Sequence, residues 1–416
     1  MAHRHWRAVR RLATTTVIGA FAVAAVASPA EAGTRPALAP GWPQLQGNAA
    51  HTGFEPGETS VTSANVSQLA QAWTAAMPGA ANFSDITVTN GTLYIAQGNS
   101  VVALSAATGA QLWQASFPGT VETTPAVQGG RVLVQWDRTV GGKSRGTVVA
   151  LTAATGATLW SRRLAVIPGH AQPLSVPLTT TASRVYVSLF HQVLALGIAH
   201  GALIWTSPVL PGCSSSAPSA AGGLVVVGGG GEYVSALHAS DGTLAWQQDF
   251  GGGCGSSSDN WVPAVSGGRV YAGLLNGVAK LNLDSGHVAW HNTAVGMVFA
   301  PLSVTASTVI AGAQDDTVLV GLDNSSGSVR WQSSAPPVIF VGGLATFGGL
   351  TWGLTQPGNN QAQAIAIDPA TGNEVYSSPV YTDFAVSFPP PVISAGRVYI
   401  NLVSEVISLA LPSAAG

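Results

Sequence analysis

Val-Ala-Leu-Ser-Ala-Ala-Thr-Gly-Ala-Gln-Leu-Trp, residues 102–113, returns almost unchanged at residues 149–160 as Val-Ala-Leu-Thr-Ala-Ala-Thr-Gly-Ala-Thr-Leu-Trp. In both copies an apolar run leads to a glycine, and a tryptophan follows that glycine by four residues. Five more copies keep this spacing, and the last ends in tyrosine. The glycine–aromatic pairs are Gly109 and Trp113, Gly156 and Trp160, Gly201 and Trp205, Gly242 and Trp246, Gly286 and Trp290, Gly327 and Trp331, and Gly372 and Tyr376. A motif recurring at a regular interval predicts a fold built of repeated units.

The spacing of the motif indicates what each unit is. Six intervals separate Trp113 from Tyr376, so the mean repeat is about 44 residues, which accommodates four strands with their turns. The glycine can supply the positive φ of a tight turn. The aromatic residue then lies in the returning strand, where its ring can fill the space between neighbouring sheets. Each repeat is therefore expected to form one four-stranded antiparallel blade of a β-propeller.

Two incomplete repeats lie at the ends of the chain. Residues 69–73 form a tryptophan strand without earlier strands of their own, and strand-like runs after Tyr376 lack a closing Gly-x-x-x-Trp. We expect residues 69–75 to pair with the C-terminal strands, closing a ring of eight blades and removing its exposed edges. The predicted fold is all-β, with a lead-in over residues 33–68 and the propeller over residues 69–416.

The composition excludes several classes of protein. Hydrophobic residues make up 46% of the 416 residues and charged residues 8%, which excludes an intrinsically disordered chain. The formal net charge is -2, without the basic footprint expected of a nucleic-acid-binding protein. Richness in alanine and glycine is typical of bacterial proteins encoded by high-GC genes. A bacterial protein without a nucleic-acid partner is therefore expected.

The first 32 residues have the pattern of a secretory signal peptide. Four arginines lie within residues 4–11, an apolar run spans residues 12–27, and Ala30-Glu31-Ala32 forms a small-x-small cleavage site. The run is shorter than the ~20 residues needed to cross a bilayer, which makes a membrane anchor the weaker interpretation. We expect cleavage near Ala32 and export to the periplasm, the cell surface or the medium, with no membrane span in the mature chain.

The repeat resembles that of the pyrroloquinoline quinone (PQQ)-like propellers. The likeness is fullest at Ala366-Ile-Asp-Pro-Ala-Thr-Gly372, and residues 42–53 with 65–73 are similar to the family's N-terminal lead-in. It covers about residues 42–411 and implies the propeller fold. It leaves the function open, because the family includes quinone-dependent dehydrogenases and also non-catalytic scaffolds, such as the lipoprotein of the outer-membrane β-barrel assembly machinery.

One cluster is a candidate ligand site. Asp259-Asn260-Trp261 precedes Val262-Pro263, where an innermost strand is expected to begin, and the equivalent positions of other repeats should lie near the axis on one face. A carboxylate, an amide and an indole there could bind a small polar ligand or a cation; loop caps and axial packing are the alternative. The candidate residues are Asp85, Thr124, Asp259, Asn260, Trp261, Phe299, Phe340 and Phe388.

The cysteines and other titratable residues suggest no catalytic or metal site. Cys213 and Cys254 each follow the tryptophan of adjacent repeats by eight residues, so a disulfide is expected in an exported protein, with two free thiols as the alternative. Asp315 and Asp316 are adjacent, but in a strand their side chains would point to opposite faces. The histidines accompany no nucleophile motif such as Gly-x-Ser-x-Gly, which argues against a hydrolase.

These features favour an exported, monomeric, non-catalytic propeller that binds or scaffolds a protein or glycan partner and needs no cofactor. The alternative is a PQQ- and calcium-dependent dehydrogenase that oxidises an alcohol or a sugar. The separated cysteines, the sparse carboxylates and the short blades argue against the enzyme. Besides the repeat itself, Asp259-Asn260-Trp261 is the feature that favours it.

Overall fold

The computed structural model describes most of the chain after residue 40. The described ranges are 41–77, 84–121, 123–140, 143–164, 176–212, 216–229, 232–251, 262–298, 300–313, 318–333, 343–382, 389–402 and 404–412. Contacts divide the chain into two units, Met1–Leu38 and Ala39–Gly416, and the described residues all belong to the second. The signal peptide predicted for residues 1–32 lies outside the described residues and stays a prediction.

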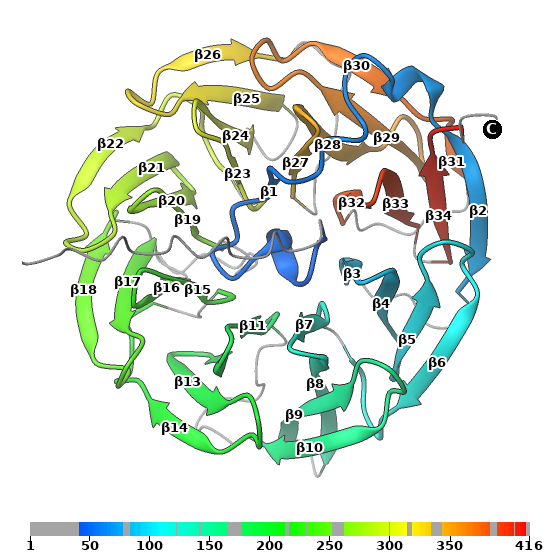
Figure 1. Cartoon of the computed structure of the whole chain (residues 1–416). Helices are drawn as coiled ribbons and strands as arrows, with labels where there is room; N and C mark the ends of the chain where they lie inside the picture. The colour runs from blue at the N-terminus through cyan, green and yellow to red at the C-terminus, as the bar shows by residue number, and fades with distance from the viewer. Residues whose placement is uncertain are drawn as a thin grey trace, which may run out of the picture. The chain divides into compact units, whose positions relative to one another are not determined.

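Eight β-sheets surround a central axis as the blades of a propeller (Figure 1). In blades 1–7 the strands follow one another outward from the axis, each antiparallel to the next. Blades 1–4 are β3 (Thr87–Thr89), β4 (Thr92–Gln97), β5 (Ser100–Ser105) and β6 (Gln111–Ser116); β7 (Ala126–Gln128), β8 (Arg131–Val140), β9 (Lys143–Thr152) and β10 (Thr158–Arg163); β11 (Thr179–Thr180), β12 (Arg184–Leu189), β13 (Gln192–Gly197) and β14 (Leu203–Thr206); and β15 (Ser219–Ala221), β16 (Leu224–Gly229), β17 (Tyr233–His238) and β18 (Leu244–Asp249).

The second half of the ring repeats this order. Blades 5–7 are β19 (Ala264–Ser266), β20 (Arg269–Leu274), β21 (Gly277–Asn282) and β22 (Val288–Asn292); β23 (Ser303–Val304), β24 (Thr308–Ala313), β25 (Val318–Asp323) and β26 (Val329–Gln332); and β27 (Ala345–Phe347), β28 (Leu350–Thr355), β29 (Gln361–Ile367) and β30 (Glu374–Ser377). Blade 7 also carries β1 (Phe54–Glu55), parallel to β27, and β31 (Tyr381–Thr382), antiparallel to β29. The predicted all-β, eight-bladed propeller is confirmed.

The eighth blade joins the two ends of the propeller. β2 (Ala70–Ala76) is its outermost strand and pairs antiparallel with β34 (Glu405–Ala410), which continues inward to β33 (Arg397–Asn401) and β32 (Val392–Ser394). Ala70 lies opposite Ala410, and Trp73 lies opposite Ser408. The predicted closure of the ring by an N-terminal strand is therefore confirmed.

The core lies between the blades. Middle strands such as β24 are buried along their whole length, because each face of a blade packs against a neighbour, and they are accordingly rich in valine, alanine and leucine. Outermost strands such as β6 are mostly exposed and bury chiefly their tryptophan, here Trp113. The repeated aromatic residue therefore lies at the outer end of each seam between blades.

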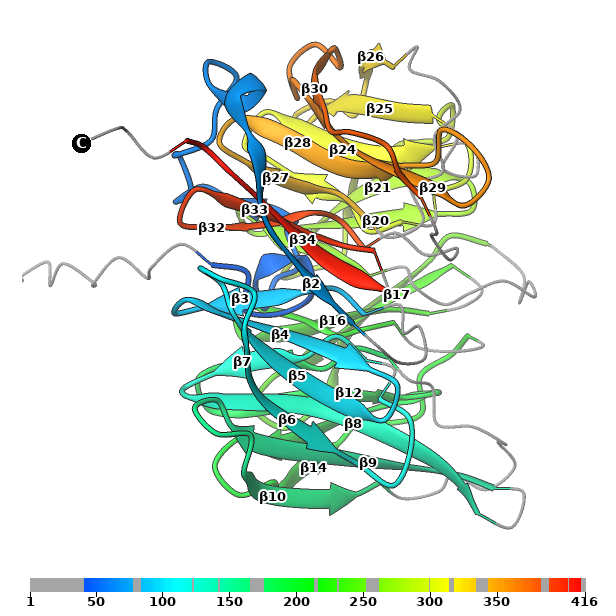
Figure 2. The ribbon, with the colours of Figure 1, turned by 90° about the vertical axis from the view of Figure 1, so that its right-hand side faces the viewer.

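One hairpin is longer than its counterparts. β8 and β9 have ten residues each, whereas β4 and β5 in the preceding blade have six. At about 3.4 Å per residue, four more residues extend the hairpin by about 14 Å. Figure 2 shows it projecting from the face of the ring opposite to that where β1 lies. We call its outer part, residues 136–140 and 143–147, the arm.

Candidate functional site

The repeat tryptophans pack onto the repeat glycines of the following blades. A Cβ atom on Gly201 would lie 2.5 Å from Cε3 of Trp160, and the Trp160 indole N–H donates to the Ile198 carbonyl at 3.0 Å. The same arrangement joins Trp73 to Gly109, Trp113 to Gly156, Trp205 to Gly242, Trp246 to Gly286, Trp290 to Gly327 and Trp331 to Gly372. The motif thus links adjacent blades.

Tyr376 occupies the tryptophan position of blade 7, next to the closing blade. Its ring centroid lies 5.7 Å from that of Trp352, and burial raises its pKa to about 12. β30 here contacts η2 (Val66–Gln68), which precedes β2. A one-turn helix of the lead-in therefore packs against the outermost strand of blade 7.

Residues 42–55, which include η1 (Leu45–Gly47), lie against the innermost strands around the axis (Figure 1). We call them the axial segment. It contacts blades 1–7 in chain order through the backbone amides of their inner strands. In blade 1, Val88 N donates to Trp42 O at 2.9 Å, and Trp42 N donates to Val88 O at 2.8 Å. In the other blades the bonds run from Val127 N to Pro43 O at 2.7 Å, Ala220 N to Ala49 O at 2.6 Å, Val265 N to Ala50 O at 2.8 Å, Val304 N to Thr52 O at 2.8 Å, and Thr346 N to Gly53 O at 2.7 Å. The chain itself therefore fills this part of the axis.

Blade 3 is held by a side chain instead. The Gln44 amide oxygen accepts from Thr180 N at 2.8 Å, and its nitrogen donates to Thr180 O at 3.3 Å, so the carboxamide replaces a backbone pairing. Gln46 is fully buried, but neither its carboxamide oxygen nor its nitrogen has a hydrogen-bond partner in the described part of the chain. Two glutamines separated by one residue thus differ completely in their bonding.

His51 lies at the centre of the axial segment. Its Nε2 is 3.1 Å from Thr179 Oγ1 and its Nδ1 is 3.1 Å from Ser219 Oγ, so the ring bridges blades 3 and 4. Burial lowers its pKa to about 3. The imidazole is therefore neutral near pH 7 and carries one ring proton, which it can donate to one of the two hydroxyls. Each hydroxyl also donates to a backbone carbonyl, Thr179 Oγ1 to Pro218 O and Ser219 Oγ to Pro263 O.

Asp85 and Thr124 are the two described members of the predicted axial cluster, and the structure brings them together. Asp85 N donates to Thr124 Oγ1 at 3.1 Å across blades 1 and 2. The Asp85 carboxyl is buried, its Oδ2 has no hydrogen-bond partner among the described residues, and burial raises its pKa to about 7. A carboxyl in this environment can exchange a proton near neutral pH or accept a hydrogen bond from a ligand.

The remaining predicted site residues lie outside the described residues. They are Asp259, Asn260, Trp261, Phe299, Phe340 and Phe388 of the axial cluster, together with Cys213 and Cys254 of the predicted disulfide. Both the cluster as a ligand site and the disulfide stay predictions.

Sequence reasoning did not identify the axial role of Gln44, Gln46 and His51. They belong to the Trp42-Pro43 to Gly53 stretch that resembles the family's lead-in, and that likeness was the available signal. Their partners are far away in the sequence; Gln44 and Thr180 are 136 residues apart. A polar residue in a short segment gives no local indication that it will be buried in this way.

Within the described ranges, no three His, Cys, Asp or Glu side chains lie close enough together to hold a metal ion. No described helix is both long and apolar enough to cross a membrane.

Comparisons with known proteins agree with this architecture. The family described as "Outer membrane protein assembly factor BamB" matches residues 57–143, 144–297 and 255–411. The crystal structure of BamB from Moraxella catarrhalis is 16% identical, covers 84% of this chain and 99% of its own, and gives a TM-score of 0.60. Quinohemoprotein alcohol dehydrogenase from Comamonas testosteroni is 15% identical, covers 91% and 81%, and gives 0.69. No curated protein matches the chain. Similarity at these identities shows the fold, while the family match spans most of the sequence: the chain belongs to the BamB family of PQQ-like β-propellers.

Proposed function

We propose that the protein is an exported, non-catalytic propeller that binds an acidic protein partner through the arm of blade 2 and the adjoining face. Membership of the BamB family supports a protein partner in general. The predicted signal peptide supports a place in the cell envelope or the medium. The observation that carries the proposal is the charge arrangement of the arm.

Two arginines face each other on the arm. Arg138 lies directly opposite Arg145 in the β8–β9 ladder, so both side chains emerge from the same face of the hairpin. Neither guanidinium makes an ion pair with a described residue, and Arg145 Nε is buried without a hydrogen-bond partner. Like charges directly opposite each other destabilise an antiparallel pair. An acidic partner would supply the missing carboxylates, which arginine binds in bidentate geometry.

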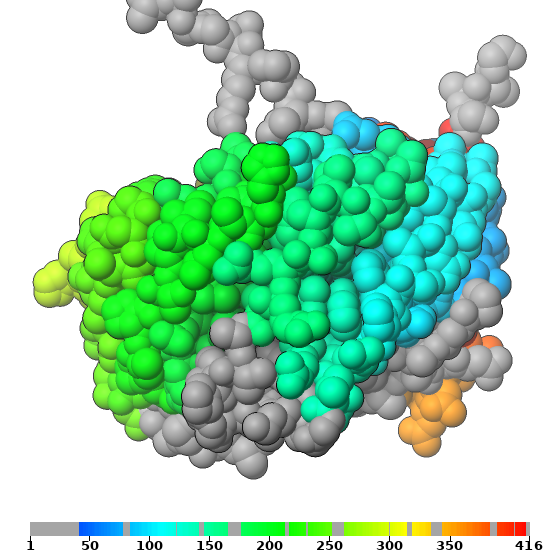
Figure 3. All heavy atoms as spheres, turned by 90° about the horizontal axis from the view of Figure 1, so that it is seen from below, coloured from blue at the N-terminus to red at the C-terminus, as the bar shows by residue number. Residues whose placement is uncertain are grey.

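The base of the arm is held firmly. Asp137 and Thr120 exchange two backbone hydrogen bonds of 2.9 Å, and Trp136 stacks on Phe117 with ring centroids 6.4 Å apart. The arginines therefore project from a pre-organised support, which lowers the entropy lost on binding. In Figure 3 the teal part of the chain, which includes this hairpin, reaches down to the lower face of the ring.

The dehydrogenase alternative is favoured by one observation, the buried Oδ2 atom of Asp85 near the axis, which has no hydrogen-bond partner among the described residues. A calcium ion takes six to eight oxygen ligands. Among the described residues near the axis, Asp85 is the one carboxyl of the predicted cluster, and the axial segment fills much of the axis. The described residues therefore do not fit a calcium–quinone site.

Site-specific photo-crosslinking in the native host tests the proposal. Benzoylphenylalanine replaces Val140 on the arm, and the matched control replaces Val288 on blade 5; these side chains are 39% and 40% exposed. We expect one protein to crosslink from position 140 and not from position 288. The purified partner should then bind the mature protein with an affinity that falls about tenfold or more between 50 and 300 mM salt.

Charge reversal decides whether the arginines carry the binding. Arg138→Glu with Arg145→Glu should abolish the crosslink, whereas Arg131→Glu, at the other end of β8, should leave it intact. A crosslink indifferent to the reversal, or none from position 140, would refute the arm as the binding surface. Saturable micromolar binding of PQQ with calcium to the same protein would favour the dehydrogenase. Recovery of a glycan instead of a protein would show that the partner is a glycan and not an acidic protein.

A further inference from the structure

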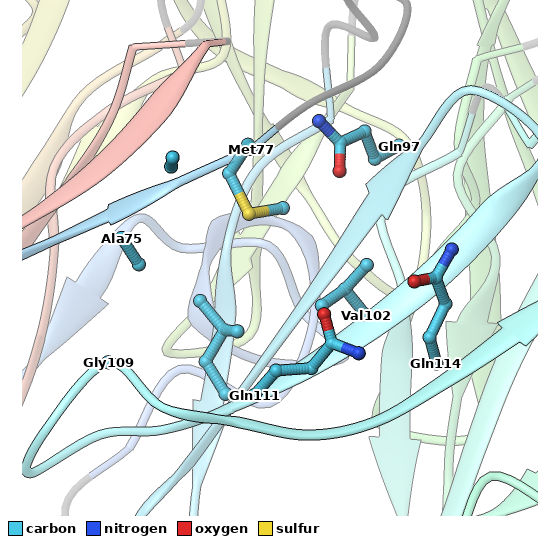
Figure 4. A pocket seen from close by; sticks show the side chains of 9 residues that line it. Ala75, Met77, Gln97, Val102, Gly109, Gln111 and Gln114 are labelled. Atoms are coloured by element: carbon cyan, nitrogen blue, oxygen red, sulfur yellow. The ribbon is translucent and has the colours of Figure 1, made fainter.

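A pocket of about 250 Å³ opens between blades 8 and 1, where the ring closes. β2 contributes Ala75 to one wall, the β5–β6 turn contributes Gly109, and β5 contributes Val102 (Figure 4). Met77, directly after β2, also lines it. The pocket therefore belongs to the outer part of the seam, away from the axial residues.

In two other seams a longer side chain occupies the position that Ala75 has here. Ala75 follows Trp73 by two residues, as Arg162 follows Trp160 and Asn292 follows Trp290. Arg162 Nη1 donates to Gly201 O at 3.2 Å, and Asn292 Nδ2 donates to Gly327 O at 2.7 Å, each at the repeat glycine of the next blade. Ala75 faces the corresponding Gly109 with a methyl group that cannot reach it, so the space beside Gly109 stays open.

Three glutamines line this space. Gln97 Nε2 is buried and has no hydrogen-bond partner within the described ranges. Gln114 Nε2 donates to Ser100 Oγ at 3.1 Å, which leaves its carbonyl oxygen as an acceptor. Gln111 is exposed at the rim, and Figure 4 shows the three carboxamides around the same hollow as the thioether of Met77. The site thus offers neutral donors and acceptors above an aliphatic wall.

We propose that this pocket binds a small, uncharged, polyhydroxylated ligand of monosaccharide size. A carboxamide both donates and accepts, which matches hydroxyl groups of either orientation. None of the nine lining residues is ionisable, so the site has no counter-charge for an acid or an amine. At about 30 Å³ per water, the volume equals roughly eight waters, enough for one sugar ring and its hydroxyls. This inference does not depend on the protein partner proposed for the arm.

Saturation-transfer NMR on the mature protein tests the site with glucose and N-acetylglucosamine as neutral probes and with glucuronate and glucosamine as charged comparators. We expect transfer to at least one neutral probe and none to the charged ones. Ala75→Arg, which imitates Arg162, should fill the pocket and remove the transfer. Ala72→Arg, an exposed position of the same strand, adds the same charge without touching the pocket and should preserve it.

A second variant separates binding from folding. Gln97→Met removes the unpartnered donor at nearly constant volume, so it should weaken the neutral sugar at least tenfold while raising the midpoint of thermal unfolding. A residue with a purely structural role would not lose binding as stability rises. Failure of both neutral probes to bind, equal transfer to the charged sugars, or full binding by Ala75→Arg would each overturn the proposal.

Discussion

The indole of Trp246 lies over Gly286 of the next blade so closely that a Cβ atom at position 286 would stand 2.6 Å from Trp246 Cδ2. Trp246 also donates its indole N–H to the Leu283 carbonyl at 2.6 Å. The glycine is thus required twice: its φ of +70° belongs to the left-handed region, and its missing side chain admits the tryptophan.

Alanine at position 286 should therefore destabilise the protein by about 2–5 kcal/mol, from backbone strain of about 1–2 kcal/mol and overpacking of about 1–3 kcal/mol. Gly268 in the same blade is the matched control, because it has the same φ of +70° and no heavy atom within 4 Å of a built Cβ. Gly268→Ala should reduce the free energy of unfolding by the backbone strain alone, about 1–2 kcal/mol. Urea unfolding measures both variants, and equal losses would contradict the close packing.

The two buried titratable groups near the axis should give stability opposite dependences on pH. Burial lowers the pKa of His51 to about 3, so the unfolded chain binds its proton first, and this contribution to stability is lost as pH falls below about 6.5. Burial raises the pKa of Asp85 to about 7, so this carboxyl contributes stability at low pH that is lost as pH rises from about 4 to 7. Each effect approaches about 1.4 kcal/mol per pH unit where the proton difference is complete.

Unfolding of two variants between pH 4.5 and 6.5 separates these contributions. Relative to the parent protein, Asp85→Asn should become more stable as pH rises, because the His51 effect is then unopposed. His51→Gln should become less stable over the same range. Identical slopes for the two variants would show that these side chains do not titrate as their burial requires.

Gln44 and Gln46 provide a test of the axial segment. Gln44→Leu leaves the buried N–H and carbonyl of Thr180 without partners and should cost about 2–4 kcal/mol. Gln46→Leu removes a buried carboxamide that has no hydrogen bonds, so it should be neutral or slightly stabilising. Thermal and urea unfolding measure the stability of both variants. A larger loss of stability from the substitution at position 46 than at position 44 would contradict the hydrogen bonding described for the axial segment.

The turn of the repeat can be stabilised in blades that lack the aspartate found there in blades 6 and 7. Asp323 Oδ1 accepts from Ser325 N and Ser326 N, both at 2.9 Å, and Asp368 Oδ1 accepts from Ala370 N at 2.8 Å. Ser105 holds the same position in blade 1. Ser105→Asp should therefore raise stability by about 0.5–1 kcal/mol. Ser105→Glu, whose longer side chain overshoots the turn, should bring no comparable gain in a thermal melt.

The ring was predictable because its signal is local and repeated. In each copy the glycine indicates a tight turn, and the tryptophan four residues later indicates packing between two blades. The unpaired tryptophan strand at residues 69–75 indicated that the N-terminal strand closes the ring, as β2 does. The axial segment has no such period: His51 meets Ser219 from 168 residues away, a contact that depends on how the whole ring assembles. Asp85 was predicted near the axis from its register before a strand, but its burial beside Thr124 depends on packing that no single repeat specifies.

The pairing of Ala70 with Ala410 also orders events in time. β2 can find its partner strand only after almost the whole remaining chain has been synthesised, so closing the ring spans a loop of about 340 residues and carries a large entropic cost. Contacts between residues so far apart in the sequence slow folding, and strand edges stay exposed until these contacts form. A nascent chain that stops before residue 405 therefore holds an open ring with β2 unpaired, ready to associate with other open rings.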